Sequence, residues 1–468
     1  MRRRSRLVKI PASGGGGGGG GGATYDTPTH YASPTGTEAW ATATDVDHPC
    51  SAATALANAA GGNVVQFAAG SYTSSSGGGE WRAAYEPTNS GSAGNYITFQ
   101  GNHAGTVVLG HTVAAPIIGV YGQDYIVFRG FRCDEANGIS STGTGPVTVS
   151  GTSHHIIIED CEIDGNGNPN SVTGNHPGVR LEGCQDVIVR YNWIHDCNES
   201  ELPYGGVNAA GVQCYESGRC EIYSNTIERC GSGVFLKNLT NLGLGYIDWF
   251  LIHHNWIENV GVGFDHGHTP FADGVFAKYY QNVIILQNSN NSASNETEYG
   301  WTDGLFYNLL ISAGKNGLMV NNTVIGGLSN SAGHRGTNLN SSTSGNKVWN
   351  NIFVNADRFS VDGQTGQADT SKISLEHNCY YSSANFRIGT PTYTIAEWRT
   401  TFLQDDAAPD SHQSDPVFVD GPNKDYRLDT GSPCLDAGID TLNLLGGGTT
   451  EPINQGAYIT GDETIGRP

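Results

Sequence analysis

Charged residues are scarce in this chain of 468 residues, at 15% against about 25% in an average globular protein. Methionine occurs only twice, whereas glycine occurs 66 times. Long unbranched and charged side chains favour helices, and glycine disfavours them. The composition therefore excludes a mainly helical protein and indicates an all-β chain of many short strands joined by tight turns.

Positive charge is the scarcer sign, with 24 basic against 45 acidic residues and a net charge of −21. Five of the cations stand in the first nine residues, and without them the remainder carries −26. Such a body repels nucleic acid and anionic membranes, so neither is an expected partner. An acidic polysaccharide could approach only at a local basic surface or through a bound cation.

Long apolar runs are also missing. No stretch approaches the roughly 20 apolar residues of a membrane span, and the basic start is not followed by the apolar region of a secretory signal. Nine glycines, Gly14 to Gly22, follow instead. We expect residues 1–23 to be a disordered tether or an anchor in a larger assembly, such as a homotrimer or a phage virion. The expected location is extracellular, secreted or on a virion.

A segment with alternating apolar residues recurs along the middle of the chain, from "YITFQG" to "KISLEHNCY". Its first inward residue returns every 29 to 33 residues, at Ile97, Ile126, Ile156, Val187, Cys220, Phe250 and Val283. A repeat of this length with a period of two inside each unit predicts a parallel β-solenoid. We expect the solenoid over residues 95–385, an N-terminal segment with a helical cap at 24–94, and a C-terminal cap and tail at 386–468.

Asparagine recurs just after the strands of this repeat. It tolerates left-handed turn geometry, and stacked carboxamides can hydrogen bond from one coil to the next. We therefore predict an asparagine ladder made by Asn192, Asn225, Asn255, Asn288, Asn351 and Asn378.

A second strand repeats as "GVRLEG", "GVQCYE", "GVFLKN" and "GVFAKY". Counting from each glycine predicts two outward columns of side chains on one face. The first column holds Arg180, Gln213, Phe235 and Phe276, and the second holds Glu182, Tyr215, Lys237 and Lys278. Aromatic platforms and cations are what an extended chain of acidic sugars needs from a surface.

An insertion, "DHGHTPFAD", precedes the fourth copy of this strand. It supplies Asp265, His266, His268 and Asp273 within nine residues, which suits acid–base chemistry or a cation site. The alternative is a polar loop whose side chains cap turns.

Ten cysteines leave the redox environment open. Cys197 and Cys230 follow equivalent strands and should stack on neighbouring coils, as a disulfide or as two buried thiols. Buried thiols are favoured, because Cys161, Cys214 and Cys220 also fall in apolar columns.

Two segments carry a resemblance to a known group. The opening "YASPTGTEAWATATDVDHPCSAATALANAAGGNVVQFAAGSYT" and the closing "SDPVFVDGPNKDYRLDTGSPCLDAG" with "NQGAYI" resemble the pectate-lyase-like superfamily of right-handed parallel β-helix proteins. The resemblance implies polysaccharide as the partner. Members include polysaccharide lyases, polygalacturonases, epimerases and phage tailspikes, so the fold alone does not choose an activity.

The resemblance to lyases implies roles for the outward residues. The candidate catalytic residues are Lys237, Lys278, Arg180, His266 and His268. The candidate substrate-binding residues are Tyr215, Phe235, Phe276 and Gln213, and the candidate ligands for a Ca²⁺ ion are Glu182, Asp265 and Asp273. The sequence departs from the calcium-dependent lyases, because their tight aspartate cluster is not evident.

Two classes of function remain open from the sequence. The first is an enzyme, a lyase of acidic polysaccharide by β-elimination. A glycoside hydrolase is less favoured, because the repeat region lacks the paired carboxylates that it needs. The second is a non-catalytic tailspike, fibre or surface protein that recognises glycan or acts as a spacer.

Overall fold

The fold was analysed in a computed structural model of the whole chain. The structure describes residues 25–466, except for residues 76–81, 103–105, 114, 135–143, 166–175, 198–208, 238–248, 261, 267–275, 287–307, 312–316, 327–334, 340–345, 356–357, 361–372, 383–384, 388–391, 403–410, 441–451 and 461–462. The predicted tether at residues 1–23 lies outside the described residues.

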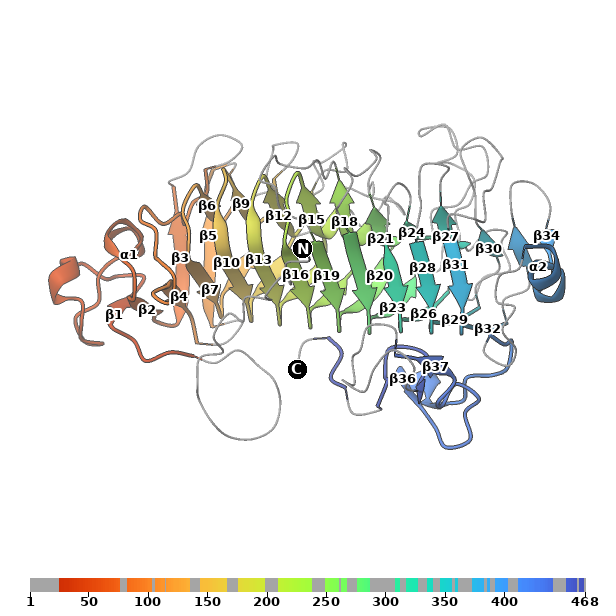
Figure 1. Cartoon of the computed structure of the whole chain (residues 1–468). Coiled ribbons are helices and arrows are strands. Elements are labelled where there is room, and N and C mark those ends of the chain that lie inside the picture. The colour runs from red at the N-terminus through yellow and green to blue at the C-terminus, as the bar shows by residue number, and fades with distance from the viewer. Residues whose placement is uncertain are drawn as a thin grey trace.

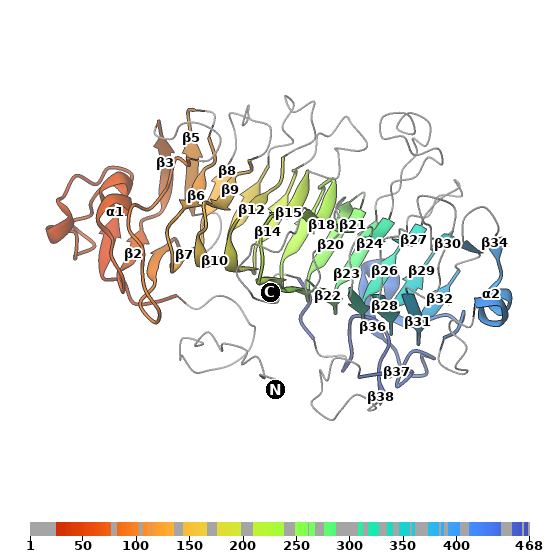
Figure 2. The same cartoon turned by 45° about the horizontal axis from the view of Figure 1, so that its top comes forward.

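The described strands wind into one long parallel β-helix, seen from two directions in Figures 1 and 2. Each full coil gives one strand to each of three sheets, A, B and C, and successive coils pair in parallel. The predicted right-handed parallel β-helix is confirmed. No helix in the described part of the chain is long and apolar enough to span a membrane.

Sheet A contains most of the strands that the repeat predicted. Ile97, Ile126, Ile156 and Val187 point inward and are fully buried. Pairing already begins at His30, because β1 pairs with β2 and β2 with β4, so the solenoid starts before residue 95. The strands in sheet order are β1 (His30–Ala32), β2 (Val64–Phe67), β4 (Ile97–Gln100), β7 (Ile126–Arg129), β10 (His154–Glu159), β13 (Gln185–Arg190), β16 (Cys220–Tyr223), β19 (Trp249–His253), β22 (Phe276–Tyr280), β25 (Leu318–Val320), β28 (Asn346–Trp349) and β31 (Ile373–Glu376).

Sheet B follows sheet A in each coil after a short turn. Its strands are β3 (Gly70–Ser74), β5 (Val107–His111), β8 (Arg132–Asp134), β11 (Glu162–Asp164), β14 (Trp193–His195), β17 (Thr226–Glu228), β20 (Trp256–Val260), β23 (Val283–Leu286), β26 (Thr323–Ile325), β29 (Ile352–Val354) and β32 (Cys379–Tyr381).

Sheet C holds the strands that open with glycine. A side chain at Gly211 would place its Cβ 2.4 Å from the buried Ile227 Cγ2, and at Gly178 2.4 Å from Ile194 Cγ2, so only glycine fits where the chain enters this sheet. The strands are β6 (Ile118–Tyr121), β9 (Val147–Ser150), β12 (Val179–Glu182), β15 (Ala210–Tyr215), β18 (Ser232–Lys237), β21 (Val262–His266), β24 (Asn308–Ile311), β27 (Arg335–Leu339), β30 (Arg358–Ser360), β33 (Asn385–Arg387) and β34 (Thr392–Tyr393).

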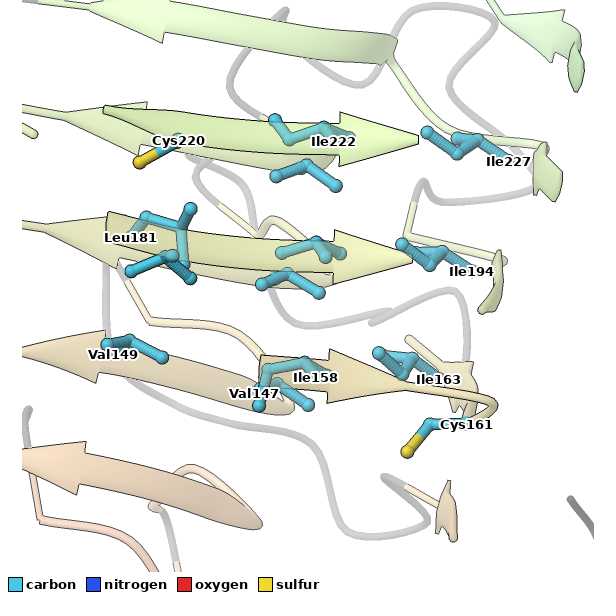
Figure 3. Close-up of a cluster of buried hydrophobic side chains, with 14 of the residues drawn as sticks. Val147, Val149, Ile158, Cys161, Ile163, Leu181, Ile194, Cys220, Ile222 and Ile227 are labelled. Carbon is cyan, nitrogen blue, oxygen red and sulfur yellow. The ribbon is translucent and has the colours of Figure 1, made fainter. Parts of the chain in front are cut away.

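The core is a column of stacked aliphatic side chains between the three sheets. Figure 3 shows Ile158, Ile163 and Val149 of one coil beneath their counterparts in the coils above. Cys161 and Cys220 lie in the same interior, and all ten cysteines are buried thiols. The burial that the sequence predicted for Cys197 and Cys230 is confirmed.

A ladder of buried asparagines forms the corner between sheets A and B. The Oδ1 atom of Asn225 accepts hydrogen bonds from the backbone N–H (3.1 Å) and from Nδ2 (3.0 Å) of Asn192. The Oδ1 atom of Asn255 accepts the same two hydrogen bonds from Asn225. The ladder consists of Asn192, Asn225, Asn255, Asn282, Asn322, Asn351 and Asn378. The prediction is confirmed except at Asn288, whose place Asn282 takes, while Asn322 adds a rung that the sequence pattern missed.

In the coil that contains Asn282, the sequence prediction assigned two strands to the wrong sheets. Val283 does not continue the sheet A column, because it belongs to β23 of sheet B and pairs with Trp256. The sheet A strand of this coil is β22, where Ala277 pairs with Phe250. The segment "GVFAKY" is therefore a strand of sheet A and not of sheet C.

Helices close both ends of the β-helix (Figure 1). At the N-terminal end, η1 (Trp40–Thr42) is followed by α1 (Ala52–Asn58), the predicted cap, which begins where Ser51 Oγ accepts from the N–H of Thr54. At the other end, α2 (Ile395–Phe402) inserts the fully buried Trp398 into the main core.

The C-terminal tail turns back along the solenoid and covers the outer face of sheet B (Figure 1). Outward residues of this face become mostly apolar from β23 onward, and Val283 and Ile352 are fully buried against the tail. Gly456 lies so close that a Cβ there would meet Ile352 Cδ1 at 2.7 Å. The tail contains η3 (Gly421–Asn423) and the strands β35 (Phe418–Asp420), β36 (Asp425–Leu428), β37 (Gly438–Ile439) and β38 (Pro452–Ile453).

The turn after β19 contains a histidine that burial keeps neutral. His253 Nδ1 lies 2.8 Å from His254 Nδ1, and the tail reaches this turn where the Gly466 N–H donates to the His254 carbonyl. Burial, and then the neighbouring His253, lower the pKa of His254 to about 4.

We expect Asn225→Ala to lower the free energy of unfolding by about 2–4 kcal/mol, because donors of Asn192 and the Val189 carbonyl lose buried partners. Urea denaturation followed by circular dichroism measures this change. Asn58→Ala is the matched control, because Asn58 is exposed at the end of α1. Equal stability of the two variants would contradict the structural role of the ladder.

We expect stability to fall as the pH drops from about 6.5 to about 4. Unfolded His254 takes up a proton near its ordinary pKa, whereas folded His254 resists until about 4, so acid favours the unfolded chain by up to about 3 kcal/mol. Melting temperatures across this range should drop less for His254→Asn, since asparagine tolerates the positive φ of 55°. His48→Asn, at an exposed site, should keep the wild-type profile.

Candidate functional site

The three outer faces of the β-helix differ in how much surface remains available to a ligand. The tail covers the later half of sheet B, and acidic residues such as Glu162 and Asp164 dominate the earlier half. On sheet A, the rings of Tyr223, His253 and Tyr280 stack on each other, with centroids 4.9 and 4.6 Å apart, so they cover one another's faces. Sheet C therefore offers the best-suited surface among the described residues.

Long stretches of chain join the strands of sheet C to their neighbours in the sequence. Connections of more than ten residues lead into β12 and β15 and leave β18. Loops carried by a rigid scaffold are where binding residues concentrate. The outer face of sheet C over β9, β12, β15 and β18 is therefore taken as the candidate site.

The two predicted columns are confirmed over these coils. Arg180 pairs with Gln213 and Gln213 with Phe235, while Glu182 pairs with Tyr215 and Tyr215 with Lys237. The sequence analysis missed the preceding coil, where Thr148 and Ser150 of "GPVTVS" extend the columns. The alternating pattern of "GPVTVS" was the available signal, but this segment has no charged or aromatic residue that would distinguish it as part of a site.

Arg180 is the hub of the polar contacts on this face. Its Nε and Nη2 donate to Glu182 Oε2 at 2.9 and 2.6 Å, and its Nη1 donates to Gln213 Oε1. Its guanidinium also lies 4.9 Å from the centre of the Tyr215 ring. All three nitrogens are engaged within the protein, so Arg180 fixes the positions of Glu182, Gln213 and Tyr215.

The two columns differ in their access to solvent. Gln213 and Phe235 are fully buried and Arg180 is 7% exposed, so the first column is covered although it points outward. The second column, formed by Glu182, Tyr215 and Lys237, is partly exposed on three consecutive coils. This second column is the part of the face that a ligand can touch, and we call it the exposed column.

Lys237 provides the amine of the exposed column. Its Nζ lies 5.6 Å from the centre of the Phe235 ring, and its backbone carbonyl accepts from the Glu216 N–H. The cation–π contact with the Phe235 ring favours a position of the Lys237 amine over the outer face of sheet C. The sequence prediction that Lys237 stands beside Tyr215 is confirmed.

The predicted second lysine lies elsewhere. Lys278 is in β22 of sheet A, where it pairs with Leu251 and Leu318, and burial lowers its pKa. Phe276 begins the same strand and pairs with Trp249. The expected pair of lysines on adjacent coils is wrong, because Lys237 and Lys278 belong to different faces.

The insertion that the sequence singled out begins within sheet C. Asp265 pairs with Phe235 and His266 with Leu236, so Asp265 takes the position in the first column that was assigned to Phe276. His268 and Asp273 lie outside the described residues. The insertion thus leaves the sheet that carries Lys237 and leads to the strand that carries Lys278.

The described carboxylate of the predicted calcium set fits a cation poorly. Glu182 Oε2 accepts two hydrogen bonds from Arg180, which compensates its charge. A second acidic group, Asp164, His195 and Asp196, lies on sheet B, where Arg229 contacts Asp196 through two bonds of 2.6 and 2.8 Å. Both groups are charge-balanced within the protein.

Comparison with known proteins gives structural matches. No family model and no curated protein matches the sequence. The pectate lyase Pel9A matches over 94% of this chain and 97% of its own, with a TM-score of 0.56 and 15% identity. A mannuronic acid specific family 6 lyase from human gut microbiota covers 71% of this chain and 72% of its own at 12% identity, and XylC with xylose covers 83% and 87% at 11%; both have TM-scores of 0.40.

The likeness to the pectate lyase is close enough in shape to be informative, and at 15% identity it concerns the fold. Because the match covers 94% of this chain, the likeness extends over the whole length of the β-helix. The protein has the pectate-lyase-like parallel β-helix fold.

Proposed function

We propose that this protein binds an acidic polysaccharide along the exposed column of sheet C and cleaves it by β-elimination. The observation that carries the proposal is the column itself, because a carboxylate, an aromatic ring and an amine stand on three successive coils at Glu182, Tyr215 and Lys237. Successive coils are about 4.8 Å apart. A line of such groups suits an extended sugar chain that runs along the solenoid.

Lys237 is the proposed base. In its neutral form, the amine takes the proton from C5 of a uronic acid unit, and the electron pair forms the C4–C5 double bond. The bond between C4 and the glycosidic oxygen breaks, and the departing oxygen takes a proton from solvent. Tyr215 provides a ring against which a sugar can pack, and Arg180 holds that ring in place.

The carboxylate of the sugar needs a compensating charge before C5 releases its proton. Arg180 is engaged with Glu182, so it acts as a positioning residue and not as the carboxylate clamp. We assign the compensating charge to a protonated His268 of the insertion at 265–273, because the other histidine, His266, pairs with the core residue Leu236. No calcium-dependent step is proposed, because the charge of Glu182 is already compensated.

The proposed location is extracellular, since a polymer of this kind cannot cross a membrane to reach an enzyme inside. Whether the protein is secreted or displayed on a virion depends on residues 1–23. Recognition of glycan without cleavage, as in a tailspike or fibre, is the second candidate function. The burial of Arg180, Gln213 and Phe235 favours it, because it leaves only one column for contact.

We expect Lys237→Ala to abolish cleavage and Lys278→Ala to leave it unchanged, because the two lysines lie on different sheets. The assay follows the ultraviolet absorbance of unsaturated products across a panel of acidic polysaccharides that includes polygalacturonate and alginate. The Lys237 side chain is partly exposed, so its loss should change stability by no more than about 0.5 kcal/mol. A chelator should not reduce turnover.

The two lysine variants distinguish the proposed site and reaction from their alternatives. Cleavage lost in Lys278→Ala and kept in Lys237→Ala would move the site to sheet A. Wild-type binding without product, weakened by Lys237→Ala, would support glycan recognition in place of the lyase. Cleavage that survives in Lys237→Ala and in a variant lacking residues 265–273 would refute the proposed machinery.

A further inference from the structure

Two cysteines meet where the C-terminal tail packs on the last coils of sheet B. Cys379 begins β32 and points outward, because it pairs with Ile352 and the next residue, Tyr380, belongs to the core. Cys434 comes from the tail, 55 residues later in the chain. Both side chains are fully buried in one apolar cluster with Val354. No partner was predicted from the sequence for either residue.

His412 completes this group. The Sγ atoms of Cys379 and Cys434 and a ring nitrogen of His412 all lie within 4.8 Å of one another. Cys434 Sγ is 3.9 Å from His412 Nε2. Such a set could hold a soft metal ion or form a disulfide beside a histidine, and the protonation of the ring decides between them.

The hydrogen bonds around the ring place its proton on Nε2. His412 Nδ1 accepts from the backbone N–H of Ser414 at 3.3 Å, so Nδ1 carries a lone pair. Gln455 directs its amide nitrogen at the His377 carbonyl, 2.7 Å away, which leaves its Oε1 to accept from His412 Nε2 at 3.0 Å. A histidine that binds a metal through Nε2 donates from Nδ1, which is the opposite arrangement.

We propose that Cys379 and Cys434 form a disulfide that fastens the C-terminal tail to the last coil, with His412 as the residue that stabilises the attacking thiolate. The oxidant is a disulfide, such as glutathione disulfide or a disulfide of another protein. The Cys434 thiolate attacks one sulfur of the oxidant, and the first thiol leaves and takes up a proton. Cys379 then loses its proton and attacks Cys434, and the second thiol leaves. Two thiols are oxidised, and one disulfide is reduced to two thiols.

In the docked tail, the surroundings of the two sulfurs shift their pKa values in opposite directions. A hydrogen bond from Cys379, together with the His412 ring, lowers the pKa of Cys434 to about 6 against the effect of burial. The contact with Cys434, and burial, raise the pKa of Cys379. Cys434 is therefore the more acidic sulfur of the docked pair, and Cys379 is the thiol, whose Sγ donates to the Ser414 carbonyl at 3.3 Å.

Burial decides when the bond can form and how long it lasts. Neither sulfur is exposed while the tail is docked, so the oxidant reaches Cys434 before docking or when the tail opens. Docking then brings Cys379 to the mixed disulfide and shields the product from reductants. The consequence is a covalent link across the apolar contact that holds the tail on sheet B.

The test uses the full chain, reduced and then incubated with glutathione disulfide. Free thiols are alkylated in denaturant, and the mass gives the number that remain. We expect wild type to lose two alkylation sites and to give, without reductant, one linked pair of peptides containing Cys379 and Cys434. Cys379→Ser and Cys434→Ser should not give this pair, and His412→Gln should give it several-fold more slowly.

Cys214→Ser is the matched control, because Cys214 is buried in the solenoid core away from the tail and should leave the linked pair unchanged. Ten alkylated cysteines after oxidation of wild type would overturn the proposal. So would one zinc ion per purified chain that disappears in Cys434→Ser while both thiols stay reduced. An unchanged rate of disulfide formation in His412→Gln would refute the role of His412 and leave the disulfide itself standing.

Discussion

The stacking of one asparagine carboxamide on the next is the interaction on which the rest of this structure depends. Each Oδ1 accepts two hydrogen bonds from the asparagine of the coil before, as Asn255 does from Asn225, and each Nδ2 also reaches a strand carbonyl. The ladder satisfies backbone groups inside a dry corner and fixes where sheet A ends and sheet B begins. With that corner fixed, the period of two decides which side chains point outward on every sheet. The exposed column of Glu182, Tyr215 and Lys237 is a consequence.

The tail imposes a second constraint, because it decides which outer face is available. From β23 onward the outward residues of sheet B are mostly apolar, and Val283 and Ile352 are buried only because the tail lies over them. Sheet A fills its own outer surface with rings stacked from coil to coil. Sheet C keeps the remaining surface among the described residues. The stability of the tail and the placement of the site are thus linked, and a bond between Cys379 and Cys434 would secure the arrangement.

The sequence predicted the solenoid, the caps and most of the ladder because these follow from period-two strands and a recurring asparagine. It also placed Arg180 and Lys237, since three copies of the glycine-led strand stack in register. It failed at "GVFAKY", because sheet A and sheet C strands share the same alternation, and only pairing with Trp249 and Leu251 shows the sheet. The burial of Arg180 and the meeting of Cys379 with Cys434 depend on contacts between distant segments, which no local pattern encodes.

We expect the outer face of sheet C to be the surface that receives polysaccharide. Hydrogen–deuterium exchange of the whole protein, with and without a saturating acidic oligosaccharide such as an oligogalacturonate, tests it most directly. The account predicts slower exchange in β12, β15 and β18, at residues 179–182, 210–215 and 232–237, and no change in the sheet A strands β13, β16 and β22. Slower exchange at β22 and its neighbours in sheet A, with none in sheet C, would contradict it.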